Sequence, residues 1–258
     1  MLEIKDLTIK INKIKIIDSI NFSAKPGDIT TIIGPNGSGK STLIKSLSGD
    51  LPYNGQILLN NHELKNIPLS KLAFQRSVLE QKSFLAFPFS VLEVMQIGIQ
   101  KTIKENSDEL ISDILRLFNL EDLRNKNFFE LSGGQQQRVQ IARTLAQVYH
   151  SNDNYSKWLF LDEPISSLDI KYQLEVMNII KKFSLSGGGV LMIMHDLNIS
   201  SIFSDYILLM RDGMKLGFGN PKDILNDNNL SKAYDCNIKV RKDTSDTFNF
   251  VLPDMIKL

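Results

Sequence analysis

The sequence predicts an α/β fold, with a mostly parallel sheet covered by helices on both faces, an N-terminal antiparallel β subdomain and an inserted α-helical subdomain. Apolar and polar residues alternate along the first 33 residues, a helical period runs from about Val91 to Ala146, and short apolar strands separated by helices return after residue 157. Strands that alternate with helices favour a parallel sheet with both faces covered.

The first part of the chain predicts antiparallel strands. Apolar residues alternate with polar ones over Leu7–Ile11, a turn fits Asn12-Lys13, and the apolar pattern resumes after it. A second turn is expected at residues 26–28, Pro-Gly-Asp. The segment Ile29–Ile33 is short and β-branched, so it predicts a buried strand. Another strand pair is expected at Gly55–Leu59 and beyond the Asn-Asn turn that follows it.

The middle of the chain changes to a helical period. Apolar residues recur three and four positions apart at Leu110, Ile111, Ile114, Leu115 and Phe118. Strands then return at Trp158–Leu161, Val190–Met194 and Tyr206–Met210. Between the first two we expect a helix that ends in the flexible loop Ser186–Gly189, with one apolar face formed by Val176, Ile179, Ile180 and Phe183.

Composition excludes several classes of protein. The chain has 258 residues, of which 42% are hydrophobic and 23% charged, as in an ordinary globular domain. A net charge of +1 argues against a protein that coats nucleic acid. The single cysteine, Cys236, has no disulfide partner and fits a reducing, cytosolic setting. No signal pattern opens the chain, and no apolar run approaches the ~18 residues that span a bilayer.

A glycine-rich loop follows the predicted strand Ile29–Ile33 and precedes helix-compatible residues. Such a loop turns backbone N–H groups toward a phosphate, and the following helix points its positive end at the anion. Lys40 reaches the β- and γ-phosphates and the Ser41 hydroxyl ligates Mg²⁺. The sequence therefore predicts ATP binding by Gly34, Pro35, Asn36, Gly37, Ser38, Gly39, Lys40, Ser41 and Thr42. The fold class is thus a phosphate-loop NTPase core.

Two adjacent acids end the apolar strand that begins at Trp158. Consecutive strand residues point to opposite faces, so the two carboxylates can do different work. Asp162 is expected to hold Mg²⁺, directly or through water. Glu163 is expected beside the γ-phosphate, where it orients or deprotonates the attacking water.

A second anion site is predicted before another helix. A serine and two glycines there present a hydroxyl and bare backbone N–H groups at the helix N-terminus. Serine and glycine also make ordinary helix caps, but the full string resembles the signature motif of the ATP-binding subunits of ABC transporters. It reads Leu131, Ser132, Gly133, Gly134 and Gln135.

Other residues match that family in order and spacing. Gln81 resembles its Q-loop glutamine, which senses the metal and the γ-phosphate, so Gln81 joins Ser41 and Asp162 in the predicted metal site. His195 resembles the switch histidine, which makes it, with Glu163 and Gln81, a predicted catalytic residue. The segment that resembles the D-loop, which crosses to the partner subunit, is Ser167, Leu168 and Asp169.

The resemblance implies a single ABC ATPase domain over residues 1–258. The nucleotide-binding core with its β subdomain would occupy 1–85 and 150–225, and the helical signature subdomain 86–149. A short C-terminal tail would follow at 226–258. In this family two copies pair head to tail, so that each ATP lies between the loop of one copy and the signature motif of the other.

The resemblance also implies partners and a place in the cell. We expect a homodimer, two transmembrane permease subunits, a periplasmic or surface substrate-binding protein that acts indirectly, and no nucleic acid. The chain would sit peripherally on the cytoplasmic face of the inner membrane. The cofactors implied are ATP and Mg²⁺.

The transported substrate is indicated by the segment after Gln81. Phe84–Val94 is similar to the corresponding segment of haemin-importer ATPases, as is the polar insertion His150–Lys157. Its phenylalanines either belong to the core or line the groove for a permease helix. We expect haem import; the alternatives are a siderophore or cobalamin importer and an ABC ATPase outside transport.

One departure from the family concerns the base of the nucleotide. Many relatives place an aromatic residue near position 11 to stack on adenine, whereas this chain has Ile9-Lys10-Ile11-Asn12-Lys13 there. We therefore expect loose selectivity for the nucleotide base.

Overall fold

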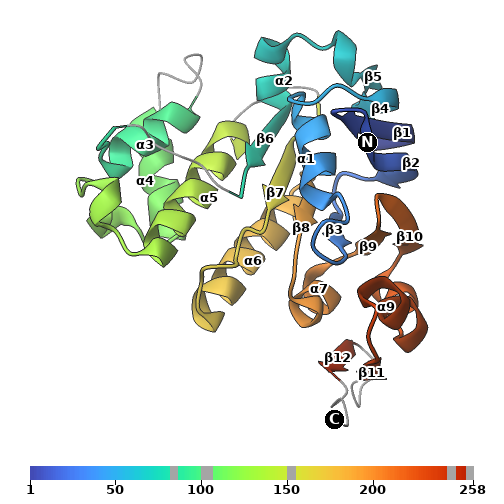
Figure 1. The fold of residues 1–258 in the computed structure, drawn as a ribbon. Coiled ribbons are helices and arrows are strands. Elements are labelled where there is room, and N and C mark those ends of the chain that lie inside the picture. The colour runs from blue at the N-terminus through green and yellow to red at the C-terminus, as the bar shows by residue number, and fades with distance from the viewer. Residues whose placement is uncertain (82–86, 100–106, 150–154, 243–247, 254–258) are drawn as a thin grey trace.

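The computed structural model describes residues 1–81, 87–99, 107–149, 155–242 and 248–253. Its main sheet has the strand order β10-β9-β3-β8-β7-β6 and is parallel except for the pair β9–β10 (Figure 1). Its strands are β3 (Ile29–Ile33), β6 (Arg76–Leu79), β7 (Trp158–Asp162), β8 (Gly189–Ile193), β9 (Tyr206–Arg211) and β10 (Met214–Gly219).

A second, antiparallel sheet forms the N-terminal subdomain in the order β2-β1-β4-β5. A turn at Asn12-Lys13, with positive φ at both residues, joins its first two strands. The Asn60-Asn61 turn, predicted after Gly55–Leu59, forms in the same way. The strands are β1 (Leu2–Ile11), β2 (Ile14–Ala24), β4 (Asn54–Leu59) and β5 (His62–Glu63).

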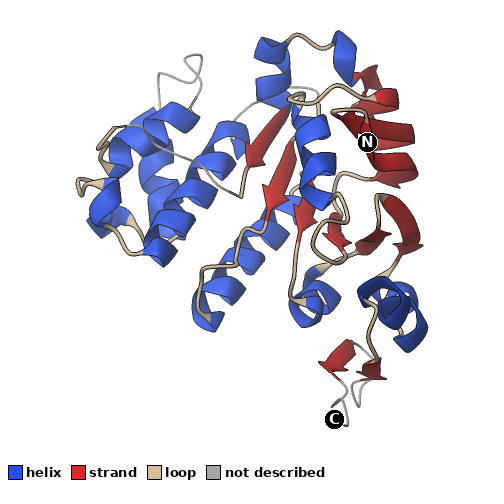
Figure 2. Ribbon diagram, viewed as in Figure 1, coloured by secondary structure: helices blue, strands red, loops and turns tan. Residues whose placement is uncertain are grey.

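Helices cover the main sheet and form the insert, which Figures 1 and 2 show to one side of the antiparallel sheet. They are α1 (Lys40–Ser48), α2 (Leu69–Gln75), α3 (Val91–Gly98), α4 (Ser107–Leu117), α5 (Gly133–Tyr149), α6 (Ile170–Leu185), α7 (Leu197–Phe203), α8 (Pro221–Ile224) and α9 (Asp227–Tyr234). Short 3₁₀ turns occur at Leu64–Asn66, Glu121–Leu123 and Phe128–Glu130.

The two faces of the main sheet pack against different parts of the chain. Along β7, Leu159 and Leu161 join the cluster formed with α3, α4, α5 and α6, whereas Trp158 and Phe160 join the cluster formed with α1 and the antiparallel sheet. This follows from the alternation of side chains along a strand. The predicted fold class is confirmed, because the main sheet is mostly parallel, is covered on both faces and has an antiparallel subdomain beside it.

The periodic residues of the helical insert are buried as predicted. Each of the predicted periodic residues is at most 2% exposed, and together they share one core with α3 and α5; they are Leu110, Ile111, Ile114, Leu115 and Phe118. A capping box begins α3: the backbone N–H of Glu93 donates to Ser90 Oγ, and Glu93 Oε2 accepts from the backbone N–H of Ser90. Apolar burial and the cap therefore both stabilise the insert.

One predicted boundary was wrong. Gly189 was expected in the loop after α6, but it is the first residue of β8 and pairs with Trp158. A Cβ at this position would lie 2.5 Å from the indole ring of Trp158, so a glycine is needed for the close packing. The glycine that suggested a loop is thus required by a strand.

Strands β6 and β10 and the ordered C-terminal region were not predicted. Residues 226–258, expected as a short tail, contain α9 and the hairpin of β11 (Ile238–Lys242) and β12 (Asn249–Pro253). Asn249 attaches this hairpin to the core: its Nδ2 donates to the carbonyl of Leu225 at 2.8 Å, and its backbone N–H donates to Ser201 Oγ at 3.1 Å. In the described part of the chain, no helix has the length and apolar character that crossing a bilayer requires.

We expect Leu115→Ala in α4 to lower the free energy of unfolding by about 2–5 kcal/mol, because it leaves a cavity in a closed core. Leu115 is 0% exposed. The matched control is Leu117→Ala on the same helix, where the side chain is 36% exposed and the loss should be below about 1 kcal/mol. Denaturant unfolding measures both variants. Equal losses would contradict the packing of α4.

Candidate nucleotide-binding site

The glycine-rich loop connects β3 to α1. Strand β3 lies between β8 and β9 and is buried at every residue, so the loop starts from a fixed point. Gly34 has a φ of 149°, and a Cβ there would lie 2.1 Å from the carbonyl oxygen of Met210. Gly39 precedes α1 with a φ of 95°, in the left-handed region. Only glycine permits this backbone, which leaves the N-terminus of α1 facing the cavity beside it.

Lys40 is held within the loop. Its Nζ donates to the carbonyl oxygens of Gly34 at 2.8 Å and Pro35 at 2.9 Å, and the residue is 6% exposed. Burial lowers the pKa of the Lys40 ammonium, while the nearby carboxylates of Glu163 and Asp162 act in the opposite direction. The cation is therefore preorganised where the loop would meet a phosphate.

The two acids differ in environment, as the alternation of strand residues predicts. Asp162 ends β7, is 4% exposed, and has an oxygen, Oδ1, without a hydrogen-bond partner among the described residues. Burial raises the pKa of the Asp162 carboxyl, while a hydrogen bond with Ser41 lowers it. Glu163 has a φ of 52°, a left-handed conformation that costs a non-glycine residue about 1 kcal/mol. Its backbone N–H donates to the carbonyl of Ile193 at 3.2 Å, which helps to hold that conformation.

The three residues predicted to be catalytic meet at one atom. Gln81 Nε2 donates to Glu163 Oε1 at 3.0 Å, and His195 Nε2 lies 2.5 Å from the same oxygen. Gln81 follows β6, Glu163 follows β7 and His195 follows β8. Because these strands are parallel neighbours, residues far apart in sequence come together at one edge of the sheet.

This cluster and the loop line a shared cavity of about 710 Å³. Asp162 lies in an adjoining cavity with Ser41 and Gln81. Gly34, Pro35 and Ser38 shape the loop but do not line the larger cavity, whose lining residues are Ile16, Asn36, Gly37, Gly39, Lys40, Ser41, Thr42, Gln81, Glu163 and His195.

A hydroxyl beside a buried carboxylate with a free oxygen suits Mg²⁺. This ion takes oxygen ligands and is commonly bound by one or two carboxylates together with substrate phosphates, so Ser41 and Asp162 supply what the protein side of such a site needs. The unpartnered Oδ1 of Asp162 is the observation that fits the ion.

The second predicted anion site lies elsewhere on the molecule. Ser132, Gly134 and Gln135 share a cavity of about 430 Å³ with the segment 167–169, and none of its lining residues lines the cavity beside the glycine-rich loop. The backbone N–H of Gln135 donates to Ser132 Oγ at 3.3 Å, and Gln135 Oε1 accepts from the backbone N–H of Ser132 at 3.0 Å. Leu131 is a buried core residue, 6% exposed.

Two contacts join α5 to neighbouring segments and were not predicted. Gln137 Nε2 donates to the carbonyl of Pro164 at 2.9 Å, directly after the acid pair. The guanidinium of Arg138 lies 3.9 Å from the ring centroid of Tyr172, just after the segment 167–169. No sequence signal marks either pair, since each partner is a common surface residue type distant along the chain.

Ile16 is the only apolar side chain among the described residues that line the cavity of the glycine-rich loop, and no Phe, Tyr or Trp is among them. Nearby in β1 and β2, the paired residues Ile11 and Ile14 are 39% and 66% exposed. The side of the loop formed by β2 is therefore aliphatic, as expected from the lack of an aromatic residue near position 11 of the sequence.

Comparisons with known proteins agree with this geometry. A family model described as ABC transporter matches residues 17–166, more than half of the chain. The hemin import ATP-binding protein HmuV of Chelativorans sp. (strain BNC1) is 42% identical over 254 residues, which are 98% of this chain and 98% of that protein.

Solved structures give the same result. The cbiO1 subunit from Clostridium perfringens, part of the ABC transporter complex cbiONQ, has a TM-score of 0.74 at 27% identity and covers 90% of this chain and 92% of that one. The dimeric structure of a bacterial ABC transporter cassette also has a TM-score of 0.74 at 27% identity, covering 86% and 99%. With its phosphate loop, acid pair and matching family model, this chain belongs to the ABC transporter family and binds ATP.

Proposed function

We propose that this chain is the ATP-hydrolysing subunit of an importer that carries haem across the inner membrane, on whose cytoplasmic face it sits. The observation that carries the proposal is 42% identity to a hemin import ATP-binding protein along nearly the whole of both chains. The meeting of Gln81 and His195 at Glu163 Oε1 supports the hydrolytic part of it.

Hydrolysis needs a water molecule aimed at the γ-phosphorus. Glu163 is the residue we assign to this water: its carboxylate accepts the proton as the water oxygen bonds to phosphorus and the bond to the β-phosphate oxygen breaks. Gln81 and His195 hold Oε1 in position, which leaves Oε2 for the water. Lys40 and the N–H groups of the loop stabilise the charge on the phosphates.

Mg²⁺ is the ion we assign to Ser41, Asp162 and Gln81. When bound, it would neutralise charge on the β- and γ-phosphates. Its charge would also offset the burial that raises the pKa of the Asp162 carboxyl.

Two copies of the chain are needed for a complete site. The loop cavity and the cavity of Ser132 and Gly134 share no lining residue, so one copy surrounds ATP on one side only. We propose a head-to-tail homodimer in which Lys40 of one copy and Ser132–Gly134 of the other enclose each ATP. ATP binding then shifts the population toward the closed dimer, and hydrolysis releases it.

The closing and opening of this dimer would change the conformation of two transmembrane permease subunits. A substrate-binding protein on the other side of the membrane would deliver haem to them. Of the phenylalanines weighed as core or groove, Phe89 packs against the core of the insert, whereas Phe87 is 65% exposed. Phe84 lies outside the described residues. Phe87 is therefore the one we assign to the permease.

We expect Glu163→Gln to keep ATP binding but to lower turnover about 10²- to 10⁴-fold, because the amide cannot accept the proton of the attacking water. The ATP-bound dimer should accumulate and is detected by size-exclusion chromatography with ATP. Glu109→Gln, an exposed acid on α4, is the matched control and should leave both readings unchanged. Normal turnover in Glu163→Gln would overturn the assignment.

We expect the chain to hydrolyse GTP and CTP with KM values within about tenfold of that for ATP, because an aliphatic wall supplies no base stacking, an interaction worth about 1–3 kcal/mol. Ile16→Tyr should tighten binding of all three nucleotides. Steady-state kinetics with each nucleotide measures this. A KM for ATP more than about 100-fold below those for GTP and CTP would show that another group recognises the base.

We expect the chain, reconstituted in proteoliposomes with its permease subunits, to increase ATP hydrolysis when a haem-loaded binding protein is added. Lys40→Ala provides the background rate. The same vesicles are then tested with ferric siderophore and with cobalamin and their binding proteins. Stimulation by one of these and not by haem would replace haem as the substrate.

A further inference from the structure

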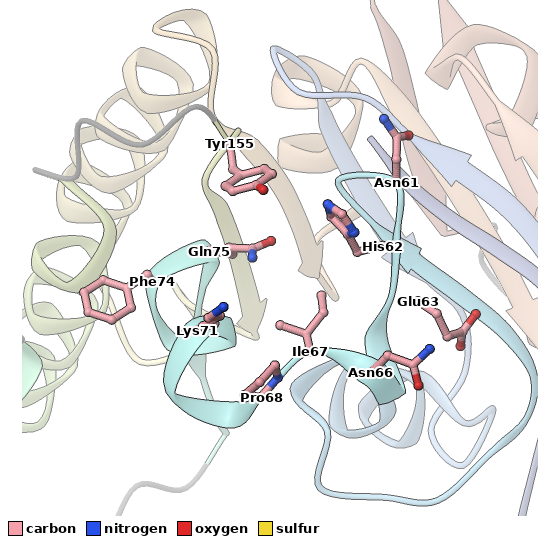
Figure 3. A pocket seen from close by; sticks show the side chains of 10 residues that line it. All are labelled: Asn61, His62, Glu63, Asn66, Ile67, Pro68, Lys71, Phe74, Gln75 and Tyr155. Carbon is pink, nitrogen blue, oxygen red and sulfur yellow. The ribbon is translucent and has the colours of Figure 1, made fainter.

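A second large cavity lies far from the nucleotide loop. It has a volume of about 750 Å³, within the roughly 300–1,000 Å³ typical of small-molecule sites. Figure 3 shows its walls: the end of the β4–β5 hairpin, helix α2 and the segment that leads into β7. This segment enters β7 at Trp158, whereas the acids of the nucleotide site follow its other end, about 13 Å away along the strand.

Hydrogen bonds fix the three walls relative to one another. Asn60 is 8% exposed, and its Nδ2 donates to Gln75 Oε1 at 3.1 Å and to the carbonyl of Ser156 at 3.0 Å. Lys157 Nζ donates to the carbonyl of Phe74 at 2.7 Å. The hairpin, α2 and the approach to β7 are thus tied together, and the cavity is a built feature of the fold.

Two side chains that can bind iron lie in edge-to-face contact in this cavity. The rings of His62 and Tyr155 have centroids 5.9 Å apart at 75°, and both point into the space in Figure 3. Within the described ranges, neither the His62 imidazole nor the Tyr155 hydroxyl has a hydrogen-bond partner. Histidine and tyrosine are both axial ligands of haem iron.

The other lining residues offer both apolar and polar contacts, and three of them, Asn61, Asn66 and Gln75, carry amides. Ile67 and Pro68 give an apolar wall, and Lys71 adds a cation from α2. Glu63 also lines the cavity, but its carboxylate is turned to the opposite side of β5 (Figure 3), where it accepts from the Tyr53 hydroxyl at 3.2 Å. The acid closest to His62 in sequence therefore does not oppose an anionic ligand.

We propose that this cavity binds one iron porphyrin, with His62 ligating the iron, Tyr155 beside it and Lys71 pairing with a carboxylate of the ligand. The identity of the ligand rests on the proposed function, since haem is the molecule that this transporter would release into the same compartment. The chain would then bind the molecule whose transport it powers.

The test is a titration of the full chain with haemin, followed by the Soret band and by fluorescence of Trp158, the one tryptophan of the chain. We expect one equivalent to bind and to quench Trp158, because Trp158 begins β7 three residues after Tyr155, which lines the cavity. His62→Ala should weaken binding by about tenfold or more and change the Soret position. Tyr155→Phe should shift the spectrum while keeping the ring.

Two controls separate this site from adventitious binding. His195→Ala removes an exposed histidine elsewhere and should bind haemin as the unaltered chain does. Iron-free protoporphyrin should bind more weakly and be indifferent to His62→Ala. Equal haemin affinity in the unaltered chain and in His62→Ala, with circular dichroism showing both folded, would mean an adventitious ligand only and would overturn the proposal.

The transport assay with haem identifies the transported substrate independently of haemin binding in this cavity. Loss of haemin binding with haem-stimulated ATP hydrolysis intact would reject the cavity alone. Haemin bound through His62 in a chain that responds only to another substrate would reject the proposed cargo alone.

Discussion

The structure depends on a single carboxylate oxygen shared by three strands. Glu163 Oε1 is contacted by Gln81 and His195, which arrive from the strands on either side. Glu163 reaches this position only through a left-handed backbone, so the neighbouring strands must supply the energy that holds it there. A different strand order would leave three distant polar residues at separate edges, whatever their spacing in the sequence.

Each face of the main sheet has its own partner, and this division has a consequence for ATP. The insert packs on one face and carries Ser132 and Gly134, whereas the antiparallel sheet and α1 pack on the other. The glycine-rich loop and the signature motif therefore open into different cavities. This separation of the two cavities is the feature on which the proposed head-to-tail pair rests.

The same elements connect the cavity at His62 to the nucleotide. Helix α2 forms one wall of that cavity and passes directly into β6, which leads to Gln81. Strand β7 begins at Trp158, three residues after the cavity residue Tyr155, and ends at Asp162 beside the loop residue Ser41. Strand β7 is buried at every residue, whereas α2 buries only Leu72 and Gln75.

The sequence by itself determined the local chemistry: the loop at Gly34–Ser41, the acid pair, the serine and glycines before α5 and the apolar periods of the sheet and insert. These features are local because backbone geometry and side-chain alternation act over a few residues. Gly189 shows the limit, since a glycine typical of a loop serves a strand whose partner lies 31 positions earlier, at Trp158. Only the tertiary structure decided which distant residues meet: Gln81 and His195 at Glu163, Gln137 at Pro164, and His62 at Tyr155. These meetings follow from strand order and packing, which no short segment encodes.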